Sequence, residues 1–569
     1  MSINPALAEF IDSPDTVDFV IERSEMLMNY IKDNPYIILT QILQDRYVIG
    51  YINRNHVNSI IENLGGGYVS TIPFAMGLLD IESLEGAGIF QVQQQPYLDL
   101  KGRGTLIGFV DTGIDYTKDT FIYEDGTSKI QYIYDQSERG NVPEGFFLGS
   151  EYTNTQINEA LKSENPYDIV PQKDTVGHGT FLASIAAGRK DSSGFIGAAP
   201  DAELIIVKLK KSRPYYNELF CVPPEQGNVY GSNAVMLGIE YIIKKARELN
   251  RPVVICLGVG TNLGSHDGFS LFEEFLSDIA NIRGVCICAA GGNESQARHH
   301  HRNLLTANGE EQNIDIKVGD NAGSIYVSLW NVASDRLSVA VRSPTGELVG
   351  RVVPKSGTVL ERRLMLEKTI VHIGYYFPVE GSGGQFTVIK LFDATPGIWT
   401  IIVHGDIVLD GNYHAWLPIT GLVSPSVEFL TPTPYTTIVV PGTATGIITC
   451  GAYDSNTNSL YINSSWGPTR LPATAPDLVA PGVNVGGVLP IGYGTMEGTS
   501  VSTAITAGAS ALLMQWGIVE ENDIAMSTYQ IRAYLIRGCN RNQNLKYPNP
   551  QWGFGSLNLM HSFNLMREM

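Results

Sequence analysis

An alternation of short apolar runs with helical stretches constrains the fold of this chain more than any other feature. Between residues 105 and 295, apolar runs such as "LIGFV" and "GVCICAA" alternate with amphipathic stretches such as "SNAVMLGIEYIIKKARELN". Strands that are apolar on both faces are typical of a parallel sheet, because helical crossovers cover both sides of it. The same pattern resumes at residue 441. We therefore predict an α/β fold, a parallel sheet with helices on both faces, formed by residues 96–295 and 441–569.

Two further units are predicted around this domain. Residues 296–440 carry period-two runs such as "GSIYVSLWNV" and "QFTVIKLF", separated by turn signals such as "SPTGE". This pattern predicts an inserted all-β sandwich or jelly roll. Residues 1–95 carry two strand-like runs, "YIILTQI" and "YVIGYI", then a helical stretch capped by Asn53 or Asn55 and strand-like "YVSTIPFAMGLLDI", which predicts a small α+β unit. Residues 90–104 are predicted as a linker.

Composition excludes several classes of protein. The chain has 569 residues, of which 43% are hydrophobic and 17% charged, as in a globular protein of several domains. Its net charge of −19 argues against nucleic acid or an anionic membrane as a partner. The six cysteines are too few for a disulfide framework in so long a chain. No apolar run reaches the roughly 18 residues of a membrane span, and "MSINPALAEF" does not resemble a signal peptide, so we expect cytoplasmic synthesis.

Three polar residues stand where α/β sheets place reactive groups, at the ends of strands and the starts of helices. Asp111 follows the strand "LIGFV", His178 lies between two glycines before "TFLAS", and Ser500 precedes a long apolar helical run. Taken singly, the aspartate and the serine could be helix caps and the histidine a surface residue. Together they supply the nucleophile (Ser500), the base (His178) and the orienting acid (Asp111) of nucleophilic acyl transfer.

A fourth residue completes this chemistry. Asn293 follows a buried strand within the turn "AAGGNES". Its amide could donate to the oxyanion of a tetrahedral intermediate, together with the backbone N–H of Ser500 at its helix N-terminus. As a lone turn asparagine it would be unremarkable.

The motifs "DTGID", "GHGTFLAS", "AAGGNES" and "EGTSVSTA", in this order, resemble those of the subtilisin-like serine proteases, or subtilases, and "PDLVAPG" supports the resemblance. It implies a serine endopeptidase with the triad Asp111, His178 and Ser500 and the oxyanion residue Asn293. It also implies a pocket for the residue before the scissile bond, lined by Leu257, Gly258, Val259, Ala289, Ala290 and Gly291. Departures from the family pattern at residues 501–504, at Cys256 and in the extra glycine before Asn293 delete no catalytic group.

By the same resemblance, residues 1–95 correspond to a propeptide, a ferredoxin-like chaperone and inhibitor whose tail is the first substrate. An attached tail has a high effective concentration and must lie extended to bind as an added strand. The segment "GIFQVQQQPYLDL" is β-prone, and a bond before Pro96 is a poor substrate. We therefore predict self-cleavage in the region of Gln93, Gln94 and Gln95, after which the freed prodomain stays bound.

The layout of the domains is most similar to clostridial subtilases of the spore germination protease (Csp) type. This resemblance implies a protein substrate, the zymogen of a cortex-lytic enzyme, and packaging in the spore. An α/β-hydrolase is excluded because its acid and histidine would follow the serine in sequence. The alternative that stays open is a pseudoprotease, masked by its prodomain and acting as a sensor or scaffold.

No cofactor is expected. Residues 297–303, "ARHHHRN", carry three adjacent histidines, but neighbours along a loop rarely converge on one ion, so we predict a solvated loop and no metal site there. The segment "GYGTMEG" lacks the lysine and the spacing of a phosphate-binding loop. Subtilases often bind structural calcium, and no stretch of this chain identifies such a site.

Overall fold

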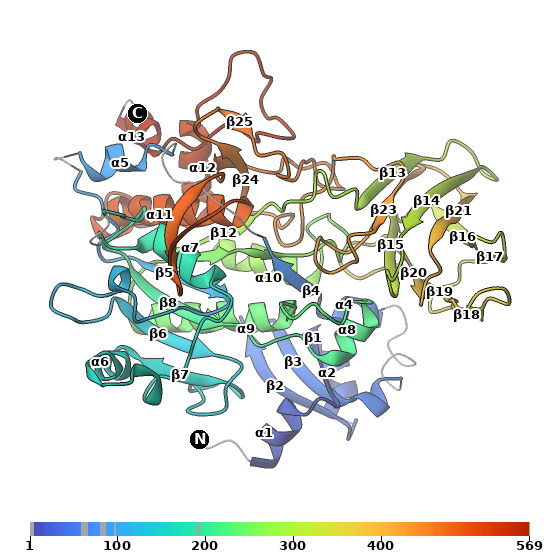
Figure 1. Cartoon of the computed structure of the whole chain (residues 1–569), viewed down its shortest axis with the longest axis horizontal. Coiled ribbons are helices and arrows are strands. Elements are labelled where there is room, and N and C mark those ends of the chain that lie inside the picture. The colour runs from blue at the N-terminus through green and yellow to red at the C-terminus, as the bar shows by residue number, and fades with distance from the viewer. Residues whose placement is uncertain are drawn as a thin grey trace.

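The computed structural model describes residues 5–32, 34–58, 67–79, 87–95, 98–190 and 194–567. Its centre is a nine-stranded sheet in the order β25-β24-β12-β10-β5-β8-β6-β7, with β26 beside β24 (Figure 1). The strands from β24 to β6 run parallel, and β25 and β7 add antiparallel edges. The predicted parallel α/β sheet is therefore confirmed. The strands are β5 (Leu106–Asp111), β6 (Ile130–Asp135), β7 (Ser150–Thr153), β8 (Glu203–Lys208), β10 (Val253–Leu257), β12 (Val285–Ala290), β24 (Ile448–Asp454), β25 (Ser459–Leu460) and β26 (Leu478–Pro481).

Helices cover both faces of this sheet. On one face lie α7 (His178–Ala187) and α11 (Thr499–Met514), and on the other lie α9 (Ser232–Glu248) and α10 (Leu271–Ala280). Every residue of α7 and of α11 is buried, because small side chains let both helices approach the sheet closely. Within the described residues, the stretch Thr499–Val519 is long and apolar enough to cross a membrane, but 89% of an 18-residue apolar window within it is buried in the protein, as in the core helix of a globular domain.

Residues 300–429 form two antiparallel sheets that pack face to face. One is six-stranded, in the order β13-β22-β15-β20-β19-β18, and the other is five-stranded, in the order β17-β16-β21-β14-β23. Side chains from both sheets, Val327 and Trp399 among them, fill the core between them. The predicted inserted β sandwich is therefore confirmed. Its strands are β13 (His300–Leu304), β14 (Glu311–Val318), β15 (Ile325–Asn331), β16 (Arg336–Arg342), β17 (Leu348–Val352), β18 (Val359–Arg363), β19 (Ile370–Tyr376), β20 (Gln385–Phe392), β21 (Gly397–Ile407), β22 (Asn412–Trp416) and β23 (Val427–Phe429).

The adjacent histidines at residues 299–301 do not form the predicted solvated loop. They are buried where the insert leaves the α/β domain, because β13 pairs with β22. The ring of His300 stacks on Trp416 with centroids 4.7 Å apart, and its Nε2 lies 3.0 Å from Nδ1 of His414. Burial, reinforced by His266, lowers the pKa of His300 to about 3, so this ring is neutral at pH 7. Among the described residues there is no group of three or more metal-ligating side chains.

The N-terminal unit contains an antiparallel sheet in the order β1-β3-β2, formed by β1 (Thr16–Glu22), β3 (Tyr47–Asn53) and β2 (Ile37–Leu43). Asn53 caps the turn that follows, since its side chain accepts from the Asn55 N–H. The predicted strand at residues 68–81 is partly wrong, because Gly67–Thr71 is helix α4 and the described strand is β4 (Ala75–Leu78). Residues 80 and 81 of that prediction lie outside the described residues.

Candidate active site

The three predicted triad residues meet above the carboxyl end of the sheet. Asp111 is the last residue of β5, His178 the first of α7 and Ser500 the second of α11. Nδ1 of His178 lies 2.8 and 2.9 Å from the two carboxylate oxygens of Asp111, and Nε2 lies 3.3 Å from Oγ of Ser500. All three side chains are buried. In this arrangement the imidazole can take the serine proton while the carboxylate holds the opposite ring nitrogen.

Two side chains that the sequence analysis missed hold the start of α7 in place. The helix begins after Gly177, which has no side chain to cap it. Asp174 caps it instead, because its carboxylate accepts from the N–H groups of Gly177 (2.7 Å) and Thr180 (2.9 Å). The hydroxyl of Thr112 accepts from the N–H of Gly179. This bond joins the residue that follows β5 to the first turn of α7, beside His178.

The predicted pocket residues lie at the ends of the neighbouring strands β10 and β12 and in the residues that directly follow them. Leu257 ends β10 and pairs in register with Ala289 near the end of β12, so the two sets meet beside the triad. Gly258 follows directly, and a Cβ there would lie 2.9 Å from Cε1 of His178. Only glycine therefore lets this backbone run so close to the catalytic base. The set Leu257, Gly258, Val259, Ala289, Ala290 and Gly291 is buried throughout.

Hydrogen bonds to Thr499 fix the orientation of the Asn293 carboxamide. Its Oδ1 accepts from both the backbone N–H and the hydroxyl of Thr499, each at 3.1 Å. Because a backbone N–H can only donate, the oxygen must face Thr499 and the amide nitrogen must face the other way. Thr499 directly precedes Ser500, so the same helix start places the nucleophile and sets the direction of the amide donor. No sequence pattern singled out Thr499 in advance.

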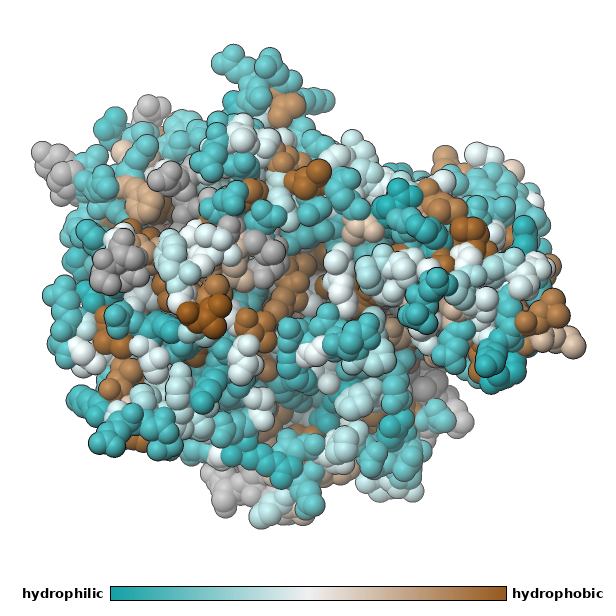
Figure 2. Space-filling view, in the orientation of Figure 1, coloured by the Kyte–Doolittle hydropathy of each residue, from teal (hydrophilic) through white to brown (hydrophobic). Residues whose placement is uncertain are grey.

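A strand of the N-terminal unit lies in the cleft beside the triad. β4 is paired antiparallel between β9 (Tyr230–Gly231) and β11 (Val259–Gly260), and the Leu79 N–H donates to the carbonyl of Gly258 at 3.2 Å. Figure 2 shows hydrophobic residues gathered in a hollow near the middle of this face, where Figure 1 places β4. Pairing of an extended segment with two strand edges is the way in which a peptide substrate binds to a sheet.

The segment that the sequence analysis placed in the cleft lies elsewhere. Ile89–Gln93 forms helix α5, and Gln94 follows it as the C-terminal cap, so the extended conformation predicted for Gln93, Gln94 and Gln95 is wrong. The Gln93 amide donates to two backbone carbonyls, of Gly197 (2.9 Å) and Ala198 (2.7 Å). The physical reason is that Ile89 and Val92, one helical turn apart, are buried together in the core on the α7 and α11 side of the sheet.

Ion pairs attach the N-terminal unit to the α/β domain. The buried carboxylate of Asp18 lies 3.1 Å from both Lys210 and Arg213. Burial raises the pKa of this carboxyl, but the two cations outweigh it and hold the pKa well below its usual range.

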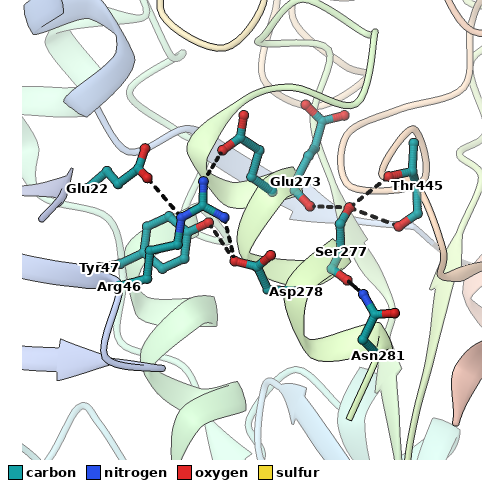
Figure 3. A network of polar contacts seen from close by, with 9 residues as sticks. Glu22, Arg46, Tyr47, Glu273, Ser277, Asp278, Asn281 and Thr445 are labelled. Carbon is teal, nitrogen blue, oxygen red and sulfur yellow. Dashed lines mark hydrogen bonds and ion pairs between the residues drawn. The ribbon is translucent and has the colours of Figure 1, made fainter.

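A second attachment lies at α10 (Figure 3). The Arg46 guanidinium bonds Glu22 of its own unit and, across the interface, Glu274 (3.0 Å) and Asp278 (2.8 Å). Tyr47 donates to the same Asp278 carboxylate at 3.2 Å. These groups are part-exposed, so they add orientation more than affinity.

Known proteins share both the motifs and the architecture. A family model described as "Subtilase family" matches residues 102–331 and 411–555. The solved structure of the Clostridium perfringens CspB protease is 32% identical, covers 85% of this chain and 98% of that chain, and superposes with a TM-score of 0.75. Shorter stretches match the subtilase-type proteinase RRT12 of Saccharomyces cerevisiae (33% identity over 84 residues) and the serine protease AprX of Bacillus subtilis (36% over 100 residues). Each covers 14% of this chain, and they span only 16% and 23% of those two proteins. With this match over more than half of its length and the triad assembled, the chain belongs to the subtilase family of serine proteases.

Proposed function

We propose that this chain is an endopeptidase that cuts its own N-terminal unit from the protease domain and then acts on a protein zymogen. The observation that carries the proposal is a complete triad with a strand of the same chain bound in its cleft. In the reaction, Ser500 attacks the carbonyl carbon and its proton passes to Nε2 of His178. The Asn293 amide and the Ser500 N–H stabilise the oxyanion, and His178 returns the proton to the leaving amine. Water then releases the acyl group by the same route.

From the position of β4 we infer a self-cleavage bond nearer to the N-terminus than Gln93. β4 leads past Gly258, which lies against His178, whereas from Ala87 onward the chain belongs to the core around α5. We therefore place the cut after Leu79 and before Ala87, instead of in the region of Gln93. Residues 80–86 themselves lie outside the described residues.

Intact-mass measurement tests this assignment. Purified wild-type protein is expected to yield two fragments divided between residues 79 and 87, and the Ser500→Ala variant one full-length chain. Ser502→Ala is a matched control, because this buried serine two residues on donates to the Ala480 carbonyl and should leave processing unchanged. A mature chain that begins at residues 94–96 would contradict the new position.

The freed N-terminal unit is expected to remain bound through Asp18. Asp18→Asn removes the charge but keeps the shape and leaves Lys210 and Arg213 buried without a counter-ion, a loss of about 3–5 kcal/mol. On gel filtration after dilution, the processed variant should lose its N-terminal fragment while the wild type keeps it. Arg54→Ala serves as control, since the Arg54–Glu218 pair is exposed and should matter little. Equal retention by wild type and Asp18→Asn would show that this pair does not hold the fragment.

The physiological substrate that we propose is a protein zymogen. The domain layout resembles that of spore germination proteases of the Csp type, and the likeness to the Clostridium perfringens CspB protease supports that resemblance. We therefore infer a role in spore germination, with the zymogen of a cortex-lytic enzyme as substrate and packaging in the spore. The test is to incubate the processed enzyme with a cortex-lytic zymogen from the organism that encodes this chain. Cleavage by the wild type and not by Ser500→Ala is expected. An uncut zymogen beside a readily hydrolysed peptide substrate would argue against this substrate while leaving the peptidase activity in place.

A further inference from the structure

A cavity of about 360 Å³ lies where the three units of the chain meet. Its walls are aromatic, with Tyr68 from the N-terminal unit, Phe220 from the α/β domain, and Trp330 from the insert. None of the triad or pocket residues lines it, so it is separate from the active site. A concave apolar space of this size is typical of a small-molecule site.

The pleat of β20 places a charged residue on the cavity wall. Alternate residues Ile389 and Leu391 face the core of the sandwich, whereas Phe386, Val388 and Lys390 face the other two units. Side chains alternate between the two faces along a strand. Because Ile389 and Leu391 point into the sandwich core, Lys390 between them must point to the outer face. Only 7% of Lys390 is exposed.

Three hydrogen-bond donors of this cavity lack an acceptor. Over the described parts of the chain, the Lys390 ammonium has no hydrogen bond and no carboxylate within ion-pair distance, and it lies 5.8 Å from the ring centroid of Tyr326. The Trp330 indole N–H and the Ser70 hydroxyl are buried, line the same cavity and have no partner among the described residues. Unpaired buried polar groups are costly, and a buried unpaired cation most of all.

The charged neighbours of Lys390 do not compensate it. Burial lowers the pKa of the ammonium, and Cys221 and Glu361 act in the opposite direction. The Glu361 carboxylate, however, bonds Nδ1 of His372 at 3.1 Å. Glu380 also lines the cavity, but it is exposed to solvent and forms no ion pair with Lys390. The described side chains therefore supply no acceptor for the three donors, and the cavity has room for a ligand that does.

We propose that this cavity binds a small amphipathic carboxylate, with its apolar body against Tyr68, Phe220 and Trp330 and its anionic end at Lys390. The carboxylate supplies the acceptor that the ammonium and the indole N–H lack, and the aromatic walls bury the rest of the molecule. Because the walls come from all three units, such a ligand stabilises their association by mass action and opposes departure of the N-terminal unit.

The test uses two fluorescent probes with the same rings, anilinonaphthalene sulfonate and the uncharged phenylnaphthylamine, on the full-length Ser500→Ala protein. We expect saturable binding of both probes at one site. Lys390→Met should lower the affinity for the sulfonate by about tenfold or more and leave the affinity for the amine unchanged. Lys355→Met, at an exposed lysine of the same domain, should change neither.

A second variant tests whether the probes bind in this cavity. Val388→Trp fills the cavity and should block both probes in protein that still melts cooperatively. Unchanged binding in folded Val388→Trp would mean that the probes bind outside this cavity. Equal affinity of the parent protein and Lys390→Met for the sulfonate would mean that Lys390 does not bind the anionic group. Absence of saturable binding to the parent protein would overturn the proposal altogether.

Discussion

Replacement of Ser500 by alanine is expected to lower peptide-bond hydrolysis by about 10⁶-fold, a magnitude known from subtilisin, itself a member of this family. The triad acts as a unit, so without the hydroxyl at 3.3 Å from Nε2 of His178 no group accepts the acyl chain. The fold should persist, because α11 begins after Gly498 and the Ser500 hydroxyl is not its cap. Turnover of a peptide substrate by processed enzyme, with a thermal melt alongside, measures both effects.

Labelling with a fluorophosphonate probe distinguishes an active serine protease from a pseudoprotease masked by its prodomain. β4 in the cleft would block labelling of the uncut chain, so the probe must be offered to protein freed of its N-terminal unit. An adduct on Ser500, absent in Ser500→Ala and present in Ser502→Ala, is the expected result. Activity above about a tenth of wild type in Ser500→Ala would mean that another group is the nucleophile. An unlabelled Ser500 in the freed protease domain would favour a sensor or scaffold.

The sheet and the triad could be predicted because their signals are local. Strands such as Val285–Ala290 are buried along their whole length, and a run of apolar residues shows this without knowledge of the partner strand. Asp111, His178 and Ser500 each lie at the boundary between an apolar run and a turn, where sequence patterns are easiest to interpret. The structure brings together residues that lie 67 and 322 positions apart, and the order of motifs characteristic of the family made that meeting predictable.

The errors come from pairings over long sequence distances. β4 is a strand of four residues whose partners are the two-residue strands β9 and β11, more than 150 positions away, so no local pattern marks it as the cleft strand. The apolar residues Ile89 and Val92 are compatible with either a short strand or one helical turn. The segment is helical because both side chains are buried on the same side of α5. His300 is buried against residues of β22, which pairs with it from beyond position 410. Local polarity could not reveal this contact.

Replacement of Asn293 by alanine is expected to lower kcat by about 10²–10³-fold, the loss known for the corresponding asparagine of subtilisin. KM should change little, because the oxyanion that the amide stabilises exists only in the transition state. The hydrogen bonds from Thr499 make the prediction specific, since they fix the carboxamide with its nitrogen as the outward donor.

Two matched variants distinguish this role from packing. Asn293→Asp keeps the shape but replaces the donor with an acceptor, so it should be at least as harmful as alanine. Thr499→Val removes one of the two bonds to Oδ1 and keeps the backbone N–H, so the amide stays roughly oriented and kcat should fall by less than in Asn293→Ala. A rise in KM with unchanged kcat in Asn293→Ala would mean that Asn293 binds substrate in the ground state. In that case the backbone N–H of Ser500, at the N-terminus of α11, would have to stabilise the oxyanion alone.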